Sequence, residues 1–273
     1  MQSRYTESEA AKFVEKYAPV HGQDLALRVY TSRLLGQDPT LVLHGGGNTS
    51  VKSVAAELTG ERVEVLYVKG SGWDLERIEP AGFPACRLEA LRRQCRLPEL
   101  SDQDMVKGLR SQMLDPQSPT PSVEALLHAF LPHKFVDHTH ANAVLTLVDQ
   151  PNGAELAREA WGNGLLFVPY VMPGFVLAQR IVELEAEVAK CELMVLDKHG
   201  IFTWGGTARE SYERMIAAVD RAEQLIAKRR GAVASVPDTI GADERRRRQR
   251  ELSPVLRGAL SRLEPEQLRT IAG

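Results

Sequence analysis

Apolar residues recur at helical spacing in several segments of the chain, with polar residues between them. Spacings of three and four residues place such side chains on one face of a helix. Two of these segments open with Thr three residues ahead of Glu, at Thr6 and Thr207, which is the capping-box spacing of a helix N-terminus. The predicted helices cover residues 6–18, 24–35, 83–96, 101–114, 123–130, 152–161, 175–190 and 207–230.

Short apolar runs between turn residues predict strands. They cover residues 40–43, 63–69, 136–148, 164–171, 193–196 and 201–204. Residues 197–200 form a predicted hairpin turn, and several other strands are also joined by tight turns. The order of elements is not a strict alternation of strand and helix. We therefore predict an α/β fold with a mixed or mainly antiparallel sheet covered by helices, rather than a doubly wound parallel sheet.

The pattern changes after Gly231, where a linker at residues 236–238 leads into a charged segment. We predict a main domain at residues 1–231, and a linker with a charged helical tail at residues 232–273. The tail helix should cover residues 243–262 and be interrupted at Pro254. Its basic run, Arg245 to Arg248, is more typical of a solvated helix or a subunit contact than of a nucleic-acid site, because one such cluster in a near-neutral chain is common.

Composition narrows the class of protein. The 273 residues carry a formal net charge of -2, with 43% hydrophobic and 26% charged residues, so we expect neither nucleic acid nor membrane as partner. No apolar run is long enough to span a bilayer, and the N-terminus lacks a signal-peptide core. The three cysteines, Cys86, Cys95 and Cys191, form no C-x-x-C pair and are typical of reduced thiols. We expect a cytoplasmic protein.

A candidate metal site lies in residues 121–140, PSVEALLHAFLPHKFVDHTH. His138 and His140 are two apart on a predicted strand, so they share a face. His199 supplies a third imidazole, and catalytic zinc sites use three protein ligands. Glu124, on the preceding helix, is a candidate base. The alternatives are half-buried histidines with ordinary hydrogen bonds, and a glutamate that pairs with His128 or interacts with the helix dipole.

Two glycine-rich turns, each at the end of a predicted strand, are candidate anion sites. The first is HGGGNTSVK at residues 44–52, and the second is GSG at residues 70–72. Glycines let backbone N–H groups approach an anion, and Asn48, Ser50 and Lys52 could add donors. Neither turn matches a known nucleotide-binding sequence, and a plain tight turn is the alternative.

Four motifs in this order, HGGGNTSVK, KGSGWDL, PSVEALLHAFLPHKFVDHTH and LDKHGIFTWG, resemble the class II aldolase/adducin family. Within it, residues 5–230 resemble the rhamnulose-1-phosphate aldolase domain of bifunctional aldolase/lactaldehyde dehydrogenase proteins. The resemblance implies an α/β/α sandwich around a mainly antiparallel sheet, a homotetramer and one zinc ion per subunit. It also implies an acid/base role for Glu124. The implied zinc ligands are His138, His140 and His199; the implied phosphate and substrate contacts are Gly46, Gly47, Asn48, Ser71, Gly72 and Ser122.

The resemblance further implies the reaction. A deoxyketose 1-phosphate, with L-rhamnulose 1-phosphate as the expected substrate, would be cleaved to dihydroxyacetone phosphate and an aldehyde such as lactaldehyde. Two alternative enzymes, a sugar-phosphate 4-epimerase and a dehydratase, could use the same metal site. The alternative outside enzymes is an adducin-like scaffold protein, which catalyses no reaction. Glu124 favours the aldolase over the epimerase. Tyr170 is a candidate for the proton donor that family members take from a neighbouring subunit.

Overall fold

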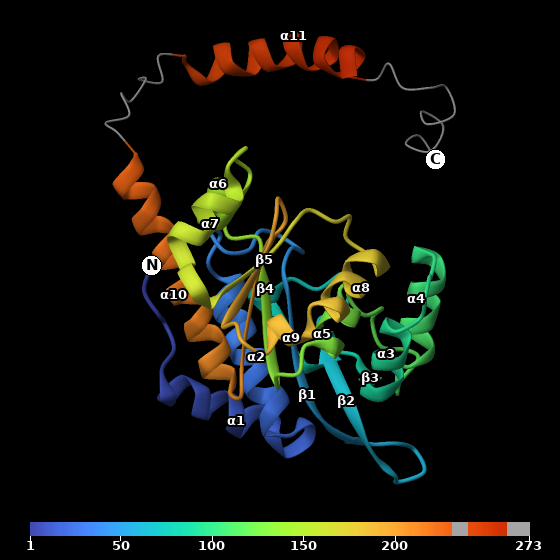
Figure 1. The fold of residues 1–273 in the computed structure, drawn as a ribbon. Coiled ribbons are helices and arrows are strands. Elements are labelled where there is room, and N and C mark those ends of the chain that lie inside the picture. Colours follow the sequence, from blue (N-terminus) through green and yellow to red (C-terminus); the bar gives the residue numbers. More distant parts are fainter. Residues whose placement is uncertain (231–239, 261–273) are drawn as a thin grey trace. The chain divides into compact units, whose positions relative to one another are not determined.

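The central feature is one sheet in a computed structural model that describes residues 1–230 and 240–260. The described part of the chain forms a seven-stranded sheet in the order β3-β2-β1-β4-β7-β6-β5 (Figure 1). Every neighbouring pair is antiparallel except β5 and β6, which are parallel. The predicted mainly antiparallel sheet is therefore confirmed. The strands are β1 (Asn48–Ala56), β2 (Arg62–Val68), β3 (Ala85–Arg87), β4 (Phe135–Thr139), β5 (Leu165–Val168), β6 (Leu193–Leu196) and β7 (Gly200–Gly205).

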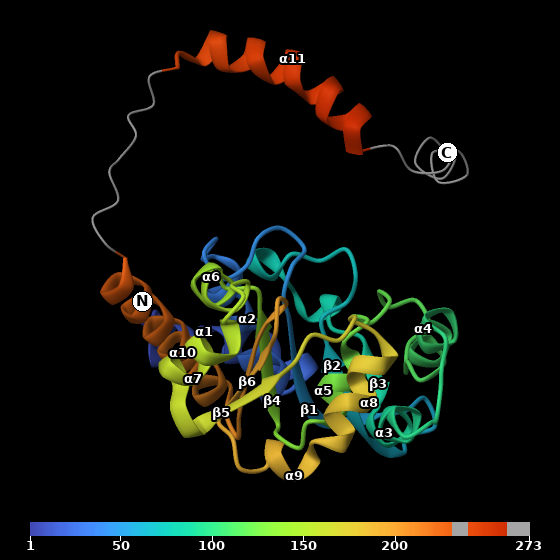
Figure 2. The ribbon, with the colours of Figure 1, turned by 45° about the horizontal axis from the view of Figure 1, so that its top comes forward.

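Helices cover both faces of this sheet and make a three-layer α/β/α sandwich (Figure 2). One layer consists of α1 (Glu7–His21), α2 (Gln23–Gly36), α6 (Asn142–Val148), α7 (Gly153–Trp161) and α10 (Ala208–Arg229). The opposite layer consists of α3 (Leu88–Cys95), α4 (Asp102–Ser111), α5 (Ala125–Phe130), α8 (Phe175–Glu183) and α9 (Glu185–Val188). Short 3₁₀ turns lie at η1 (Leu75–Arg77), η2 (Pro80–Gly82) and η3 (Gly162–Gly164).

Each face of the sheet has its own hydrophobic core, because successive side chains of a strand point to opposite sides. On β4, Phe135 packs into the core beneath α2 and α10, whereas Val136 packs into the core beneath α5 and α8. Every residue of β4 is buried. The strand therefore lies at the centre of the molecule, where its polar residues need internal partners.

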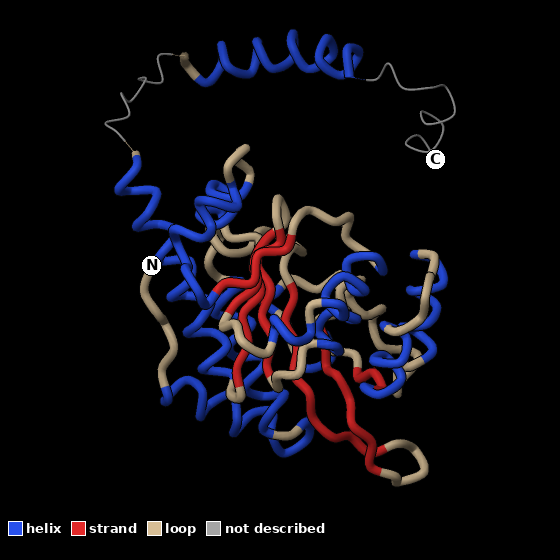
Figure 3. Tube along the Cα trace, viewed as in Figure 1, coloured by secondary structure: helices blue, strands red, loops and turns tan. Residues whose placement is uncertain are grey.

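Some predicted elements are wrong in type (Figure 3). Residues 40–43 form no strand, and β1 begins only at Asn48, where the chain pairs with β4 and, from Ser50 on, also with β2. The predicted strand at residues 136–148 stops at Thr139, and its second half is α6, whose buried Val144, Leu147 and Val148 follow a helical period. In segment 83–96, residues 85–87 pair with β2 and form the edge strand β3 instead of joining the helix.

Other differences concern where helices end. The predicted helix at residues 175–190 breaks at Leu184, between α8 and α9. The tail helix α11 (Ala242–Leu260) runs through Pro254 without the predicted interruption. Its Arg246, Arg247 and Arg248 form ion pairs with acidic residues one turn before them.

Residues Met1–Arg229 form one unit, and the chain from Arg230 onward is a second unit that contains α11. The predicted boundary at residues 231 and 232, the linker at residues 236–238 and the predicted helix end at Arg262 lie outside the described residues. Over the described ranges, no helix combines the length and the apolar character needed to cross a membrane.

Candidate active site

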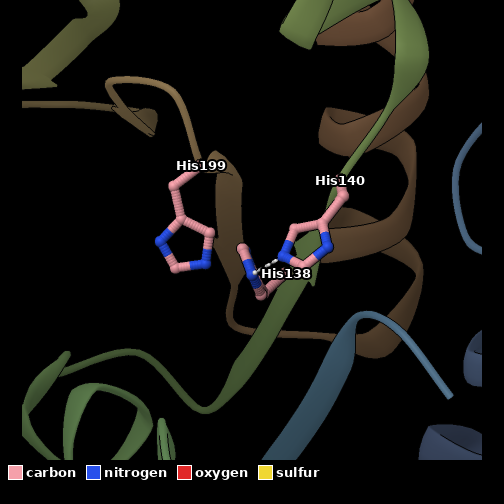
Figure 4. Close-up of side chains that lie close together, drawn as sticks. All are labelled: His138, His140 and His199. Atoms are coloured by element: carbon pink, nitrogen blue, oxygen red, sulfur yellow. Dashed lines mark hydrogen bonds between the residues drawn. The ribbon is translucent and has the colours of Figure 1, made fainter. Parts of the chain in front are cut away.

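Three imidazoles from two neighbouring parts of the sheet face one another (Figure 4). His138 lies on β4, His140 directly follows that strand, and His199 lies in the turn between β6 and β7. Because β7 pairs with both β4 and β6, the turn is carried to the end of β4. One nitrogen from each ring can be chosen so that all three lie within 4.8 Å of one another. The three histidines singled out in the sequence are therefore neighbours in space.

The hydrogen bonds of His138 leave a lone pair directed at its neighbours. Its Nδ1 donates to the Ile201 carbonyl at 3.1 Å, so Nε2 of the neutral ring carries no proton. Complete burial lowers the pKa of His138 well below its usual value, and the charged forms of His140 and His199 would lower it further. His138 Nε2 lies 3.0 Å from His140 Nε2. Metal-binding histidines usually have this arrangement: one ring nitrogen donates to a backbone carbonyl, and the other is free to bind the metal.

Glu124 completes the group from the opposite side. Its Oε2 lies 3.4 Å from His138 Nε2, and its Oε1 lies 3.4 Å from His199 Nε2. Burial raises the pKa of Glu124, while His199, Asn48 and Lys69 act in the other direction. Oε1 is buried and has no hydrogen-bond partner among the described residues. Three imidazoles that each bring a nitrogen to one point, beside a buried carboxylate oxygen without a hydrogen-bond partner, fit a divalent cation such as zinc.

A pocket of about 350 Å³ extends from this group. Backbone hydrogen bonds join the second glycine turn to the segment that precedes Glu124: Ser71 N donates to Thr120 O at 2.7 Å, and Ser122 N donates to Lys69 O at 3.0 Å. Gly47 adopts a positive φ of 64°, which glycine tolerates without strain. All of the predicted phosphate and substrate contacts line this pocket together with Glu124 and His140, namely Gly46, Gly47, Asn48, Ser71, Gly72 and Ser122.

The predicted helix at residues 123–130 begins later than expected. Helix α5 starts at Ala125, and Glu124 occupies the cap position without a side-chain cap bond. Ser122 Oγ accepts from Glu124 N at 3.3 Å and from Asn48 Nδ2 at 3.2 Å. His128 does not pair with Glu124. Its ring lies between Ser50 and Asn48.

Two further expectations from the first glycine turn are also wrong. Ser50 and Lys52 do not face the pocket: the Ser50 hydroxyl contacts the His128 ring, and Lys52 Nζ donates to the carbonyls of His128 and His133, both at 2.7 Å. Residues 48, 50 and 52 alternate with Thr49 and Val51, which are buried on the opposite face of the sheet, so all three point toward α5. Because β1 already begins at Asn48, the side chains of Ser50 and Lys52 point into the protein and not into the pocket.

Lys69 is a pocket residue that the sequence reasoning missed. It follows β2 directly, lines the pocket and donates from Nζ to Gly45 O at 2.8 Å. Burial lowers its pKa, although Asp74 and Glu124 favour the charged form. The signal available in the sequence was its place next to the Gly70 turn. Tyr170, by contrast, is 51% exposed and does not line this pocket.

Comparison with known proteins agrees with this geometry. Residues 26–226 match the family described as "Class II Aldolase and Adducin N-terminal domain". The chain is 39% identical over 239 residues to a Bacillus subtilis protein named "Uncharacterized oxidoreductase YuxG", a match that covers 85% of this chain but only 34% of that protein. The chain therefore spans about a third of the length of this relative.

Solved structures are similar as well. The N-terminal class II aldolase domain of a conserved protein from Thermoplasma acidophilum is 38% identical, with a TM-score of 0.74, covering 83% of this chain and 99% of that one. L-Fuculose-1-phosphate aldolase from Thermus thermophilus is 16% identical, with a TM-score of 0.51, covering 77% of this chain and 100% of that one. At that identity the second likeness concerns the fold.

Proposed function

Because the chain belongs to the class II aldolase and adducin family, we propose that it is a zinc-dependent aldolase that cleaves a deoxyketose 1-phosphate. The proposed substrate is L-rhamnulose 1-phosphate, and the products are dihydroxyacetone phosphate and lactaldehyde. The observation that carries the proposal is the meeting of three imidazoles and a buried carboxylate at one pocket lined by two glycine turns. We also propose a cytoplasmic homotetramer with one zinc ion per subunit.

His138, His140 and His199 would hold the zinc ion, which when bound supplies a Lewis acid for negative charge that develops on the substrate oxygens. The orientation of His138 supports this role, because the Ile201 carbonyl fixes the ring with Nε2 toward the other two histidines. A ring fixed in this way needs no rearrangement during the reaction, which lowers the cost of stabilising the transition state.

Glu124 would move the proton. As the bond between C3 and C4 breaks, the C4 hydroxyl loses its proton to solvent and C4 becomes the aldehyde carbon. The acid form of Glu124 then gives a proton to C3 of the dihydroxyacetone phosphate half and is left as a carboxylate. Burial favours this acid form because it raises the pKa of Glu124. Oε1, which has no hydrogen-bond partner in the described chain, is the oxygen free to exchange the proton with substrate.

The phosphate group would occupy the pocket between the two glycine turns. Backbone N–H groups of Gly47 and Gly72 and the side chains of Ser71 and Ser122 would be its neutral donors. Asn48 lines the same pocket, where its amide donates to Ser122 and Glu124, and the Lys69 ammonium adds a positive charge. Binding energy from the phosphate, which does not react, can then orient the bond that breaks.

The test is release of dihydroxyacetone phosphate from a panel of ketose 1-phosphates by chelated and zinc-reloaded protein. Zinc-loaded protein should cleave at least one of them, and Glu124→Gln should keep its zinc while turnover falls on the order of 10²- to 10⁴-fold. Glu64→Gln, on the exposed side of β2, is the matched control with unchanged turnover. Absence of zinc binding would contradict the proposal. Zinc binding without any cleavage would favour an epimerase or a dehydratase.

A further inference from the structure

A line of buried hydrogen bonds lies behind Glu124. Ser50 Oγ is 2.7 Å from His128 Nδ1, and His128 Nε2 is 2.5 Å from Asn48 Oδ1. Asn48 Nδ2 then donates to Glu124 Oε2 at 2.6 Å and to Ser122 Oγ at 3.2 Å. The line joins β1 to α5 and ends at the carboxylate proposed to move the proton.

When Glu124 is ionised, its carboxylate determines the direction of every bond in this line. An ionised Glu124 can only accept, so Asn48 presents its NH₂ group to the carboxylate and its Oδ1 to His128. His128 must then carry its proton on Nε2. In a neutral ring Nδ1 is left as an acceptor, and the Ser50 hydroxyl donates to it. One arrangement of protons satisfies all four side chains.

The surroundings keep His128 in this state. Its side chain is completely buried, and burial, together with the charges of Lys52 and Arg28, lowers its pKa well below the usual value. Lys52 Nζ fixes the backbone of the same residue by donating to its carbonyl. On one flank the ring lies 5.5 Å from that of Phe202, which stacks on His138.

We propose that His128 is a positioning residue, which fixes the side-chain amide of Asn48 so that its NH₂ group faces Glu124 and Ser122. The amide of Asn48 has two orientations related by a half-turn, and they differ only in which atom meets which partner. In the wrong orientation Oδ1 would face the carboxylate, and two acceptors would meet without a proton between them. The role in turnover rests on the proposed function, whereas the orientation itself does not.

This role differs from a contribution to packing alone, because it depends on the N–H group of His128 Nε2 that faces Asn48 Oδ1. An apolar residue at 128 would fill part of the space yet leave the amide of Asn48 free to turn. Glutamine could restore an N–H group toward Asn48 Oδ1. Loss of such a supporting hydrogen bond commonly reduces activity on the order of 10- to 100-fold.

Two measurements test the proposal on the zinc-loaded full chain. Neutron diffraction from a deuterium-exchanged crystal should show deuterium on His128 Nε2 and two deuterium atoms on the Asn48 nitrogen that faces Glu124. Steady-state kinetics on the best ketose 1-phosphate should show a fall in kcat/KM of roughly 10- to 100-fold for His128→Leu at unchanged zinc content. His128→Gln should recover most of that loss, and exposed His21→Gln should match the wild type.

Deuterium on His128 Nδ1, or an Asn48 oxygen facing Glu124, would overturn the proposal, as would equal activity of His128→Leu and the wild type. Equal losses in the Leu and Gln variants would reduce the residue to a packing role and also overturn it. If His128→Leu does not fold, the neutron positions and the comparison of His128→Gln with the wild type decide. A wild type without turnover would refute the proposed function, while the neutron experiment would still decide the orientation.

Discussion

The buried ion pair between Arg28 and Asp137 should be worth far more to the fold than any ion pair at the surface. Both side chains are fully buried, and Arg28 Nη2 lies 2.6 Å from Asp137 Oδ1. Ser211 donates to the other carboxylate oxygen at 2.5 Å, so the pair links α2, β4 and α10. Asp137 precedes His138 on β4 and points to the opposite face. The pair therefore anchors the strand that carries a proposed zinc ligand.

Arg28→Met leaves the Asp137 carboxylate buried without its counter-charge, which should lower the free energy of unfolding by about 3–5 kcal/mol. That is a large part of the roughly 5–15 kcal/mol that is typical of a whole domain. The double variant Arg28→Met, Asp137→Leu removes both charges, together with the hydrogen bond from Ser211 and those from Arg28 to Thr31, Ser32 and Ser50. We therefore expect a coupling energy of at least about 2 kcal/mol between the two substitutions.

Urea unfolding followed by tryptophan fluorescence, at several fixed protein concentrations, measures all four members of this cycle. Arg180→Met is the matched control, because Arg180 is 44% exposed in its pair with Glu183, and it should cost less than about 1 kcal/mol. If the changes in the free energy of unfolding caused by the two single substitutions simply add up in the double variant, Arg28 and Asp137 stabilise the fold independently. The expectation that burial strengthens their interaction would then be wrong.

Three further predictions concern the site and its supports. Lys69→Met should weaken binding of inorganic phosphate, measured by calorimetry, by roughly 10- to 100-fold, since a charge-assisted hydrogen bond is lost. Gly200→Ala should lower zinc affinity on the order of 10- to 100-fold, because a Cβ would lie 2.5 Å from the Thr139 carbonyl oxygen and 3.0 Å from the rings of His138 and His140; Gly206→Ala, which has room, should not. Burial lowers the pKa of Lys52 from 10.5 to about 7, so the unfolded chain binds the extra proton between these values and stability should rise with pH there. Urea titrations at pH 7 and pH 9 should show this rise, up to about 1.4 kcal/mol per pH unit, in the wild type and not in Lys52→Met.

Predictions from the sequence were reliable where neighbouring residues decide the outcome. Thr6 Oγ1 accepts from Glu9 N at 3.3 Å, and Thr207 Oγ1 accepts from Glu210 N at 3.1 Å, as their capping-box spacing indicated. The strand at residues 193–196 has the predicted bounds. Spacing also identified histidines that meet in space, because a short turn between paired strands leaves His199 few places to lie.

Predictions failed where partners distant in sequence decide. Residues 40–43 are apolar enough for a strand, but β1, which begins at Asn48, is the segment with strands on both sides. Residues 85–87 continue a helical pattern. They form a strand because they make backbone hydrogen bonds to β2, and these bonds outweigh the local helical propensity.

The sequence by itself determined the family, the order of the motifs and the residue types that gather at the site, because these depend on identity and spacing along the chain. Only the tertiary structure decided which polar side chains face the pocket and which face inward. His128 bonds to Asn48, 80 positions away, rather than to Glu124 on its own segment. Lys69 lines the pocket, whereas Lys52 supports α5. These assignments depend on the registration of β1 against β4 and α5, which brings together atoms that no local pattern relates.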